Sequence, residues 1–212
     1  MKSRILIADD HTLLVDGFRL MLEPEFEIVG SVEDGHALLQ AAETFKPDIV
    51  LMDISMPVLN GIDAARQLRK TQPNCKIIFV TMHSDSDYVT AAFRAGASGY
   101  VLKRAAASEL LTAIRQVLRG LHYVTPLVTK EALGSFMDDT SGKGKLSDEL
   151  TPRQREVLQL VAEGKTRKEI ATLLNISVKT VEFHKAGIMN ELKLRTSAQL
   201  IRYAIDHGLL AT

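Results

Sequence analysis

Short apolar segments alternate with helical segments through the first 120 residues, and this alternation restricts the possible folds more than any other feature. Most of the apolar segments have the length of one strand and are apolar on both faces, as is typical of strands that are covered on both sides. Strict alternation of strands and helices produces βαβ units. The first half of the chain is therefore expected to form a parallel sheet with helices on both faces.

The pattern contains five strands, and five strands in a region of this size favour the flavodoxin-like, doubly wound order 2-1-3-4-5. The expected strands are residues 4–8, 27–32, 49–53, 76–82 and 99–103. The expected helices are residues 12–22, 35–44, 61–70, 86–95 and 106–119. The fold class is thus α/β for the first half, followed by an all-α region.

The alternation stops after Gly120. Apolar residues at helical spacing after Pro126 predict a short helix, and the polar, glycine-bearing stretch 138–145 predicts a linker. From Thr151 onward only helical patterns occur. These changes predict an α/β domain over 1–124, a linker with a short helix over 125–147, and a domain of four helices over 148–212.

Three aspartates follow two of the expected strands: Asp9 and Asp10 after the first, and Asp53 at the end of the third. The carboxyl ends of neighbouring parallel strands meet in one crevice, where open α/β sheets bind their ligands. Two carboxylates about 4 Å apart repel by roughly 4 kcal/mol at an effective dielectric near 20. The cluster therefore requires a cation, and oxygen ligands of this kind predict Mg²⁺.

Further side chains at the same edge fit a phosphoryl group. Pro57 and Gly61 predict a fixed turn that exposes Asp53. The Thr81 hydroxyl can bond an oxygen placed on Asp53, and the Lys103 ammonium can neutralise it. We expect Asp53 to accept a phosphoryl group by in-line attack. The expected ligands of the Mg²⁺ ion are Asp9 or Asp10, Asp53 and the backbone carbonyl of Ser55.

These pieces, together with Met56-Pro57 and Tyr100, resemble the receiver domain of bacterial two-component response regulators over residues 3 to 120. The resemblance implies that Asp53 takes its phosphoryl group from a phosphohistidine. It also implies that Thr81 and Tyr100 move together as a switch. Tyr100 is expected near the edge of the sheet, on the opposite side of its strand from Lys103.

The helical tail contains the pattern of a helix-turn-helix. Thr151-Pro152 starts one helix, a second follows over 166–173, and Ser177 caps a longer third helix after a tight turn. The third helix has a polar face near its N-terminal half, which is the part of a recognition helix that enters the major groove. Its candidate DNA contacts are Lys179, Thr180, Glu182, Phe183, His184 and Lys185.

Charge adds a mild argument for nucleic acid. Residues 1–125 hold 13 Lys/Arg and 15 Asp/Glu, whereas residues 149–212 hold 10 and 7. A basic C-terminal region that follows an acidic N-terminal region is typical of proteins that bind nucleic acid through the C-terminal region. The single cysteine, Cys75, and the lack of a leader or an 18-residue apolar stretch predict a cytoplasmic protein with no membrane partner.

The tail resembles the LuxR-type DNA-binding domain over about 148–210, most clearly in 150–158, Ile170-Ala171 and 177–181. A receiver joined to this domain is the arrangement of NarL/FixJ-type response regulators. Gly187 departs from the pattern, because close relatives often carry arginine there. A helical glycine costs about 1 kcal/mol relative to alanine, and the departure predicts one phosphate contact fewer.

The resemblance implies a phosphorylation-switched transcriptional regulator that accepts a phosphoryl group from a sensor histidine kinase and binds double-stranded DNA. A homodimer on two half-sites is expected when the protein is phosphorylated, and RNA polymerase is a further candidate partner. The protein is expected to be no enzyme beyond its own phosphorylation and slow dephosphorylation at Asp53.

Two alternatives stay open at this point. The first is a DNA-binding regulator whose receiver is atypical and works without phosphorylation, although every chemical part of the site is present. The second is a Mg²⁺-dependent phosphohydrolase on a doubly wound sheet. Enzymes resembling the haloacid dehalogenase group carry a D-x-D nucleophile motif after the first strand, whereas this strand ends in the adjacent pair Asp9-Asp10.

Overall fold

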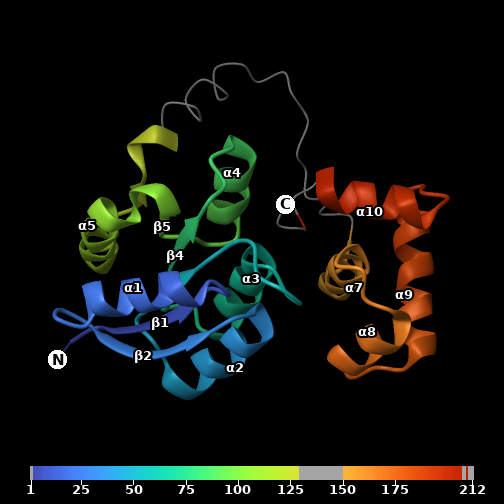
Figure 1. The fold of residues 1–212 in the computed structure, drawn as a ribbon, viewed down its shortest axis with the longest axis horizontal. Helices are drawn as coiled ribbons and strands as arrows, with labels where there is room; N and C mark the ends of the chain where they lie inside the picture. Colours follow the sequence, from blue (N-terminus) through green and yellow to red (C-terminus); the bar gives the residue numbers. More distant parts are fainter. Residues whose placement is uncertain (1, 129–149, 207–208, 210–212) are drawn as a thin grey trace. The chain divides into compact units, whose positions relative to one another are not determined.

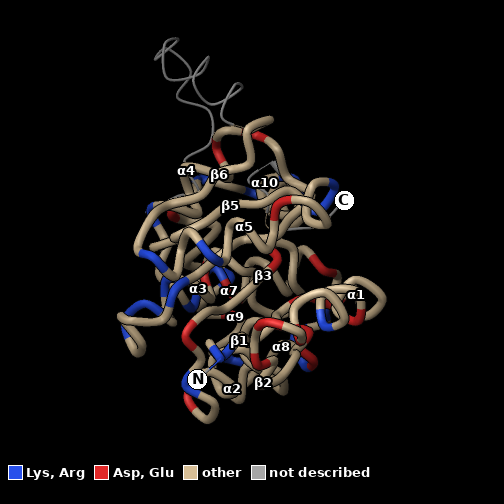
Figure 2. The backbone as a smooth tube through the Cα atoms, turned by 90° about the vertical axis from the view of Figure 1, so that its left-hand side faces the viewer, with Lys and Arg blue, Asp and Glu red and all other residues tan. Residues whose placement is uncertain are grey.

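The computed structural model describes residues 2–128, 150–206 and 209. The chain divides into two units, Met1–Gly142 and Lys143–Thr212. A parallel sheet organises the first unit, and the described part of the second contains only helices (Figure 1). Basic and acidic residues are interspersed along the backbone rather than gathered in one block (Figure 2).

The sheet has the strand order β2-β1-β3-β4-β5-β6, and every neighbouring pair is parallel. The predicted order of the first five strands is therefore confirmed. The sixth strand was not expected, because two residues are too short to produce a recognisable pattern. The strands are β1 (Arg4–Ala8), β2 (Glu27–Val32), β3 (Ile49–Met52), β4 (Lys76–Thr81), β5 (Gly99–Leu102) and β6 (Tyr123–Val124).

Five long helices and one short 3-10 turn connect the strands and cover both faces of the sheet (Figure 1). Helices α1 and α5 share a buried cluster with one face of β1, β3 and β4. The opposite face is covered by α2, α3 and α4. The helices are α1 (Thr12–Leu22), α2 (Gly35–Phe45), α3 (Gly61–Thr71), α4 (Ser86–Arg94), η1 (Lys103–Ala105) and α5 (Ala106–Leu118).

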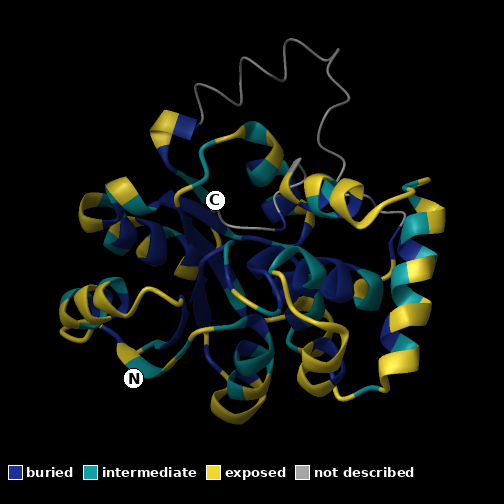
Figure 3. Ribbon diagram, turned by 45° about the vertical axis from the view of Figure 1, so that its right-hand side comes forward, coloured by how far each residue is buried: buried dark blue, intermediate teal, exposed yellow. Residues whose placement is uncertain are grey.

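The predicted strands are slightly too long at the carboxyl edge of the sheet. Strand β3 ends at Met52 and β5 at Leu102, so Asp53 and Lys103 each follow a strand instead of completing it. Lys103 begins η1. The inner strands β1, β3, β4 and β5 are almost wholly buried (dark blue in Figure 3), whereas β2 and β6 at the two edges of the sheet are not. The side chains beyond the ends of the inner strands are thus held by a rigid, buried layer.

The second unit contains the four predicted helices, α7 (Pro152–Ala162), α8 (Arg167–Leu173), α9 (Val178–Glu191) and α10 (Ser197–Asp206). Capping boxes at Thr151 and Thr166 start α7 and α8, and the Ser177 hydroxyl accepts from the Thr180 N–H to start α9. Such caps stabilise a helix by about 1 kcal/mol each. The apolar faces meet in one core, which contains Val157, Leu158, Leu160, Ile170, Val181, Ile188, Leu200 and Ala204.

The predicted linker is only partly visible. Residues 126–128 are helical, and the remainder of the expected short helix and the polar stretch 138–145 lie outside the described residues. The boundary expected at 147/148 lies there too, as does the division between the two units. No helix among the described residues combines the length and hydropathy that crossing a membrane requires.

Candidate acidic site and candidate nucleic-acid interface

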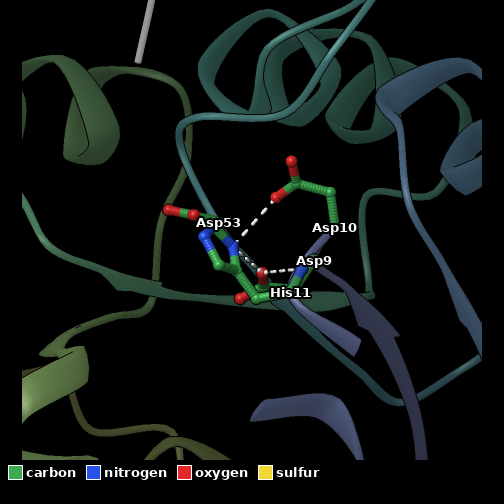
Figure 4. A group of neighbouring side chains, drawn as sticks. All are labelled: Asp9, Asp10, His11 and Asp53. Atoms are coloured by element: carbon green, nitrogen blue, oxygen red, sulfur yellow. Dashed lines mark hydrogen bonds and ion pairs between the residues drawn. The ribbon is translucent and has the colours of Figure 1, made fainter. Parts of the chain in front are cut away.

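Two buried carboxylates form the floor of the acidic site. Asp9 follows β1, Asp53 follows β3, and each residue is only 3% exposed. The prediction that the turn after β3 exposes Asp53 is therefore wrong. Strands β1 and β3 are adjacent in the sheet, and the Asp53 N–H donates to the carbonyl of Ala8 at 2.9 Å. Asp10 follows Asp9 and is exposed. Adjacent parallel strands thus place the predicted aspartates together (Figure 4).

Lys103 bridges the two buried carboxylates. Its Nζ lies 2.7 Å from Asp53 Oδ2 and 2.8 Å from Asp9 Oδ2, and its side chain is 7% exposed. Burial opposes the charge on this ammonium, but the hydrogen bonds and negative charges of Asp53 and Asp9 outweigh burial. The pKa of Lys103 is therefore raised above its ordinary value. The lysine therefore places a positive charge directly between the two buried carboxylates.

Gly61 explains how the backbone after Asp53 can turn so tightly. A Cβ at Gly61 would lie 2.0 Å from the backbone carbonyl oxygen of Asp53, which no side chain could tolerate. The preceding Asn60 caps α3 by accepting from the Asp63 N–H at 2.9 Å. Close approach of the α3 start to the β3 end therefore fixes the position of Asp53.

His11 belongs to the site although it is not among the predicted site residues. Its Nδ1 lies 2.9 Å from Asp9 Oδ1 and 3.0 Å from Asp10 Oδ1, so the ring lies against both carboxylates (Figure 4). Although His11 is the N-cap residue of α1, its side chain makes no capping hydrogen bond. Its position directly after the acidic pair is the available signal in the sequence, but the same position fits an ordinary helix start.

The donor set fits a hard divalent cation. Asp9, Asp10, His11 and Asp53 each offer one ligand atom, and these atoms lie within 4.8 Å of one another. Asp9 Oδ2 is buried and, among the described residues, accepts no hydrogen bond, although the Lys103 charge lies beside it. Carboxylate oxygens with spare lone pairs are the ligands that such cations prefer. The cluster can therefore hold a metal ion.

The residues after β4 connect the site to Tyr100. Thr81 is fully buried at the end of β4, and its hydroxyl accepts from the His83 N–H at 3.4 Å. The Tyr100 hydroxyl donates to the His83 carbonyl at 3.0 Å, and the Ser55 hydroxyl lies 2.8 Å from His83 Nε2. His83 was not among the predicted site residues, because a lone histidine in a loop carries no pattern.

Tyr100 lies deeper than the sequence suggested. It is fully buried, because β6 pairs with β5 and moves the sheet edge one strand further out. Burial, reinforced by the negative charge of nearby groups, raises the pKa of its hydroxyl far above the ordinary value. The hydroxyl therefore stays protonated and remains a hydrogen-bond donor.

Helix α9 presents one exposed face in the second unit (Figure 3). Lys179, Glu182 and Phe183 are exposed and lie at the i, i+3 and i+4 positions that share a helix face, and Phe183 is 75% exposed. Thr180, His184 and Lys185 are half-buried beside this face. The predicted contacts thus separate into a central exposed group and a flanking group.

Several predicted contacts on α9 already have partners within the unit. Glu182 forms an ion pair with Arg167 of α8, and Lys185 Nζ donates to the Ser197 hydroxyl at 3.0 Å. The Thr180 hydroxyl lies 2.8 Å from that of the capping residue Ser177. Arg167 was absent from the predicted set, since its partnership with α9 depends on tertiary packing.

Gly187 is half-buried rather than part of the exposed face. A Cβ at this position would lie 3.1 Å from the Gln154 side chain of α7, at the far end of a flexible group. The same Gln154 completes the capping box of α7. The glycine therefore allows α9 to pass close to the start of α7.

Comparison with known proteins identifies both units. Residues 5–115 match the response regulator receiver domain, and residues 148–204 match the bacterial regulatory proteins of the luxR family. The chain belongs to the NarL/FixJ-type response regulators. As a member of this family of DNA-binding regulators, the chain is a phosphorylation-dependent transcriptional regulator of the two-component type. The phosphohydrolase alternative is therefore wrong.

Relatives match the chain over nearly its whole length. The transcriptional regulatory protein MctR of Rhizobium johnstonii is 35% identical, and the match covers 99% of this chain and 96% of MctR. The oxygen regulatory protein NreC of Staphylococcus carnosus is 36% identical, and the match covers 98% of this chain and 99% of NreC. RcsB of Salmonella enterica serovar Typhimurium, solved on promoter P1flhDC with phosphomimetic BeF3-, is 28% identical, with TM-score 0.62 and coverage of 97% and 99%.

Proposed function

We propose that a sensor histidine kinase phosphorylates Asp53 in the cytoplasm and that this modification controls DNA binding by the second unit. The observation that carries the proposal is the buried bridge of Lys103 between Asp53 and Asp9. A structural ion pair needs one carboxylate, whereas this lysine serves two beside an exposed third, Asp10. Such an arrangement leaves negative charge for a cation and a positive charge for an incoming phosphoryl group.

The chemistry is a transfer between two nucleophiles. A carboxylate oxygen of Asp53 forms a bond to phosphorus while the P–N bond of the phosphohistidine breaks, and the electron pair returns to the imidazole nitrogen. Lys103 stays protonated and bonds a phosphoryl oxygen. Mg²⁺, held by Asp9 or Asp10, Asp53 and the Ser55 carbonyl, would neutralise charge on the phosphoryl oxygens. His11, whose Nδ1 lies beside both members of the acidic pair, offers a nitrogen ligand at the same place.

The response begins at Thr81 and Tyr100. A phosphoryl oxygen on Asp53 competes for the Thr81 hydroxyl, which now accepts only a long bond from the His83 N–H. Since the Tyr100 hydroxyl is bonded to the carbonyl of that same His83, a shift of this loop removes or moves the partner of Tyr100. Thr81 and Tyr100 are therefore coupled through the backbone of His83.

The output is sequence-specific binding of double-stranded DNA. Helix α9 enters the major groove with Lys179, Glu182 and Phe183 toward the bases or phosphates, while Thr180, His184 and Lys185 contact the backbone at its sides. A phosphorylated homodimer places two such helices on two half-sites. RNA polymerase is a candidate partner at the promoter.

Labelling tests the phosphoacceptor directly. We expect the full chain to incorporate phosphate from ³²P-labelled acetyl phosphate with Mg²⁺, and we expect Asp53→Asn to abolish incorporation. Asp34→Asn is the matched control, because asparagine also caps a helix and Asp34 caps α2. Equal labelling of wild type and Asp53→Asn would overturn the assignment of Asp53. A wild type that is never labelled yet binds DNA would favour the regulator that works without phosphorylation.

A further inference from the structure

Strand β6 ties the sheet to the segment that leads toward the DNA-binding unit. The Tyr123 N–H donates to the Ser98 carbonyl at 3.1 Å, and the Thr125 N–H donates to the Tyr100 carbonyl at 2.9 Å. The chain therefore leaves the sheet while it is hydrogen-bonded to β5 and to Ser98, the residue before that strand. Strand β5 carries Tyr100 and ends at Leu102, one residue before Lys103.

The side chain of Thr125 extends this ladder beyond the point where the backbone turns away. The Thr125 carbonyl accepts from the Val128 N–H at 3.0 Å, in the helical turn that begins at Pro126. The Leu102 N–H donates to the Thr125 hydroxyl at 3.1 Å instead of to a backbone carbonyl. Both residues are buried, so water cannot readily replace this acceptor.

Glu109 of α5 holds the Thr125 hydroxyl in the orientation that this ladder needs. Thr125 Oγ1 donates to Glu109 Oε2 at 2.8 Å, and the Tyr123 hydroxyl donates to the same oxygen at 3.0 Å. Because the Thr125 hydroxyl donates its hydrogen bond to Glu109, the lone pairs of its oxygen are available to the Leu102 N–H. Glu109, Tyr123 and Thr125 form what we call the exit cluster.

We propose that the exit cluster couples the Asp53 site to the DNA-binding unit and that Thr125 is its positioning residue. Leu102, whose N–H is held by Thr125, directly precedes Lys103, whose ammonium contacts Asp53 and Asp9. Thr125 also bonds the carbonyl of Tyr100. A shift of Lys103 or Tyr100 on phosphorylation is thus transmitted to the residue from which the chain continues toward the second unit.

This inference rests on the proposed function, since it requires phosphorylation of Asp53 to alter DNA binding. Coupling between two sites is measured as a ratio of affinities, and typical ratios are on the order of 5 to 150. The ratio here is the DNA affinity with acetyl phosphate and Mg²⁺ divided by the affinity without them. The DNA probe is a fragment selected by the phosphorylated wild-type chain from a random-sequence pool.

Thr125→Val keeps the side-chain shape and removes the hydroxyl, whereas Thr125→Ser keeps the hydroxyl. We expect the valine variant to lose most of the affinity ratio, with a value within about twofold of 1 if the wild-type ratio is on the order of 10. The serine variant should retain the wild-type ratio. Thr71→Val is the matched control, because the Thr71 hydroxyl bonds the Leu68 carbonyl within the last turn of α3.

Thermal unfolding and labelling at Asp53 separate coupling from general damage. A folded, fully labelled Thr125→Val with the wild-type affinity ratio would overturn the inference and leave the proposed function intact. A labelled wild type with a ratio of 1 would overturn both. If Thr125→Val fails to fold, Tyr123→Phe decides. It removes one hydrogen bond to Glu109 and keeps the ring, so we expect a reduced ratio, and an unchanged ratio would refute the coupling.

Discussion

The acidic site and helix α9 are built in opposite ways. Asp9, Asp53 and Lys103 are buried, come from three strand ends and contact one another directly. The α9 face is exposed and comes from one helix, and two charged groups of this helix, Glu182 and Lys185, are paired with neighbouring helices. Motif spacing therefore locates a buried site well, whereas helical periodicity alone does not reveal which exposed side chains are free to bind.

The largest expected effect is at Lys103. Lys103→Gln leaves two buried carboxylates without their cation, and breaking such a pair costs about 3 kcal/mol or more of unfolding free energy. We expect this loss in urea unfolding at pH 7 without divalent metal, and we expect added Mg²⁺ to recover part of it. Recovery follows because a cation bound to the native state alone stabilises that state.

Lys70→Gln is the control for the same measurement. Lys70 is exposed on α3, so its replacement should change the unfolding free energy by no more than about 0.5 kcal/mol. A Lys103→Gln variant as stable as this control, or one insensitive to Mg²⁺, would contradict the description of the acidic site as a charge cluster that needs a cation.

The two lysines of α9 provide a smaller, sharper comparison. Lys179 is exposed on the central face, whereas Lys185 is half-buried and bonded to Ser197. We expect Lys179→Ala to weaken binding to all DNA sequences and to reduce the salt slope of log affinity by about 1. Lys185→Ala should weaken binding in the same direction but less. Fluorescence anisotropy across a salt series measures both, and equal effects would show that the intramolecular bond of Lys185 does not matter.

The smallest expected effect is at Gly187. Alanine is favoured over glycine inside a helix by about 1 kcal/mol, but its Cβ would press on the Gln154 side chain at 3.1 Å. Since that side chain is flexible, we expect Gly187→Ala to raise the stability of the chain by less than about 1 kcal/mol. A lowered thermal midpoint would show instead that the Gln154 side chain cannot move away from the new Cβ, because the capping box holds it in place.

Much of the acidic site is predictable from the sequence. Carboxylates that follow apolar runs have to meet where parallel strands end, and so the strand pattern alone places Asp9 and Asp53 together. Lys103 follows from the same rule. His11 and His83 could not be assigned, because their contacts depend on loop conformation, and loops obey no fixed period.

The sheet and helix α9 show the same limit. The first five strands and their order follow from the βα alternation, whereas β6 is two residues long and is defined by pairing with β5. On α9, the partners of Glu182 and Lys185 come from α8 and α10. Interactions between elements that lie apart in the chain leave no local pattern in the sequence.

Phosphorylation of Asp53 is expected to switch DNA binding. The most direct measurement is the affinity of the full chain for its selected DNA fragment, with and without acetyl phosphate and Mg²⁺, in wild type and Asp53→Asn. The account predicts a rise in affinity on the order of tenfold for wild type and no change for Asp53→Asn. Equal responses of the two proteins would contradict it.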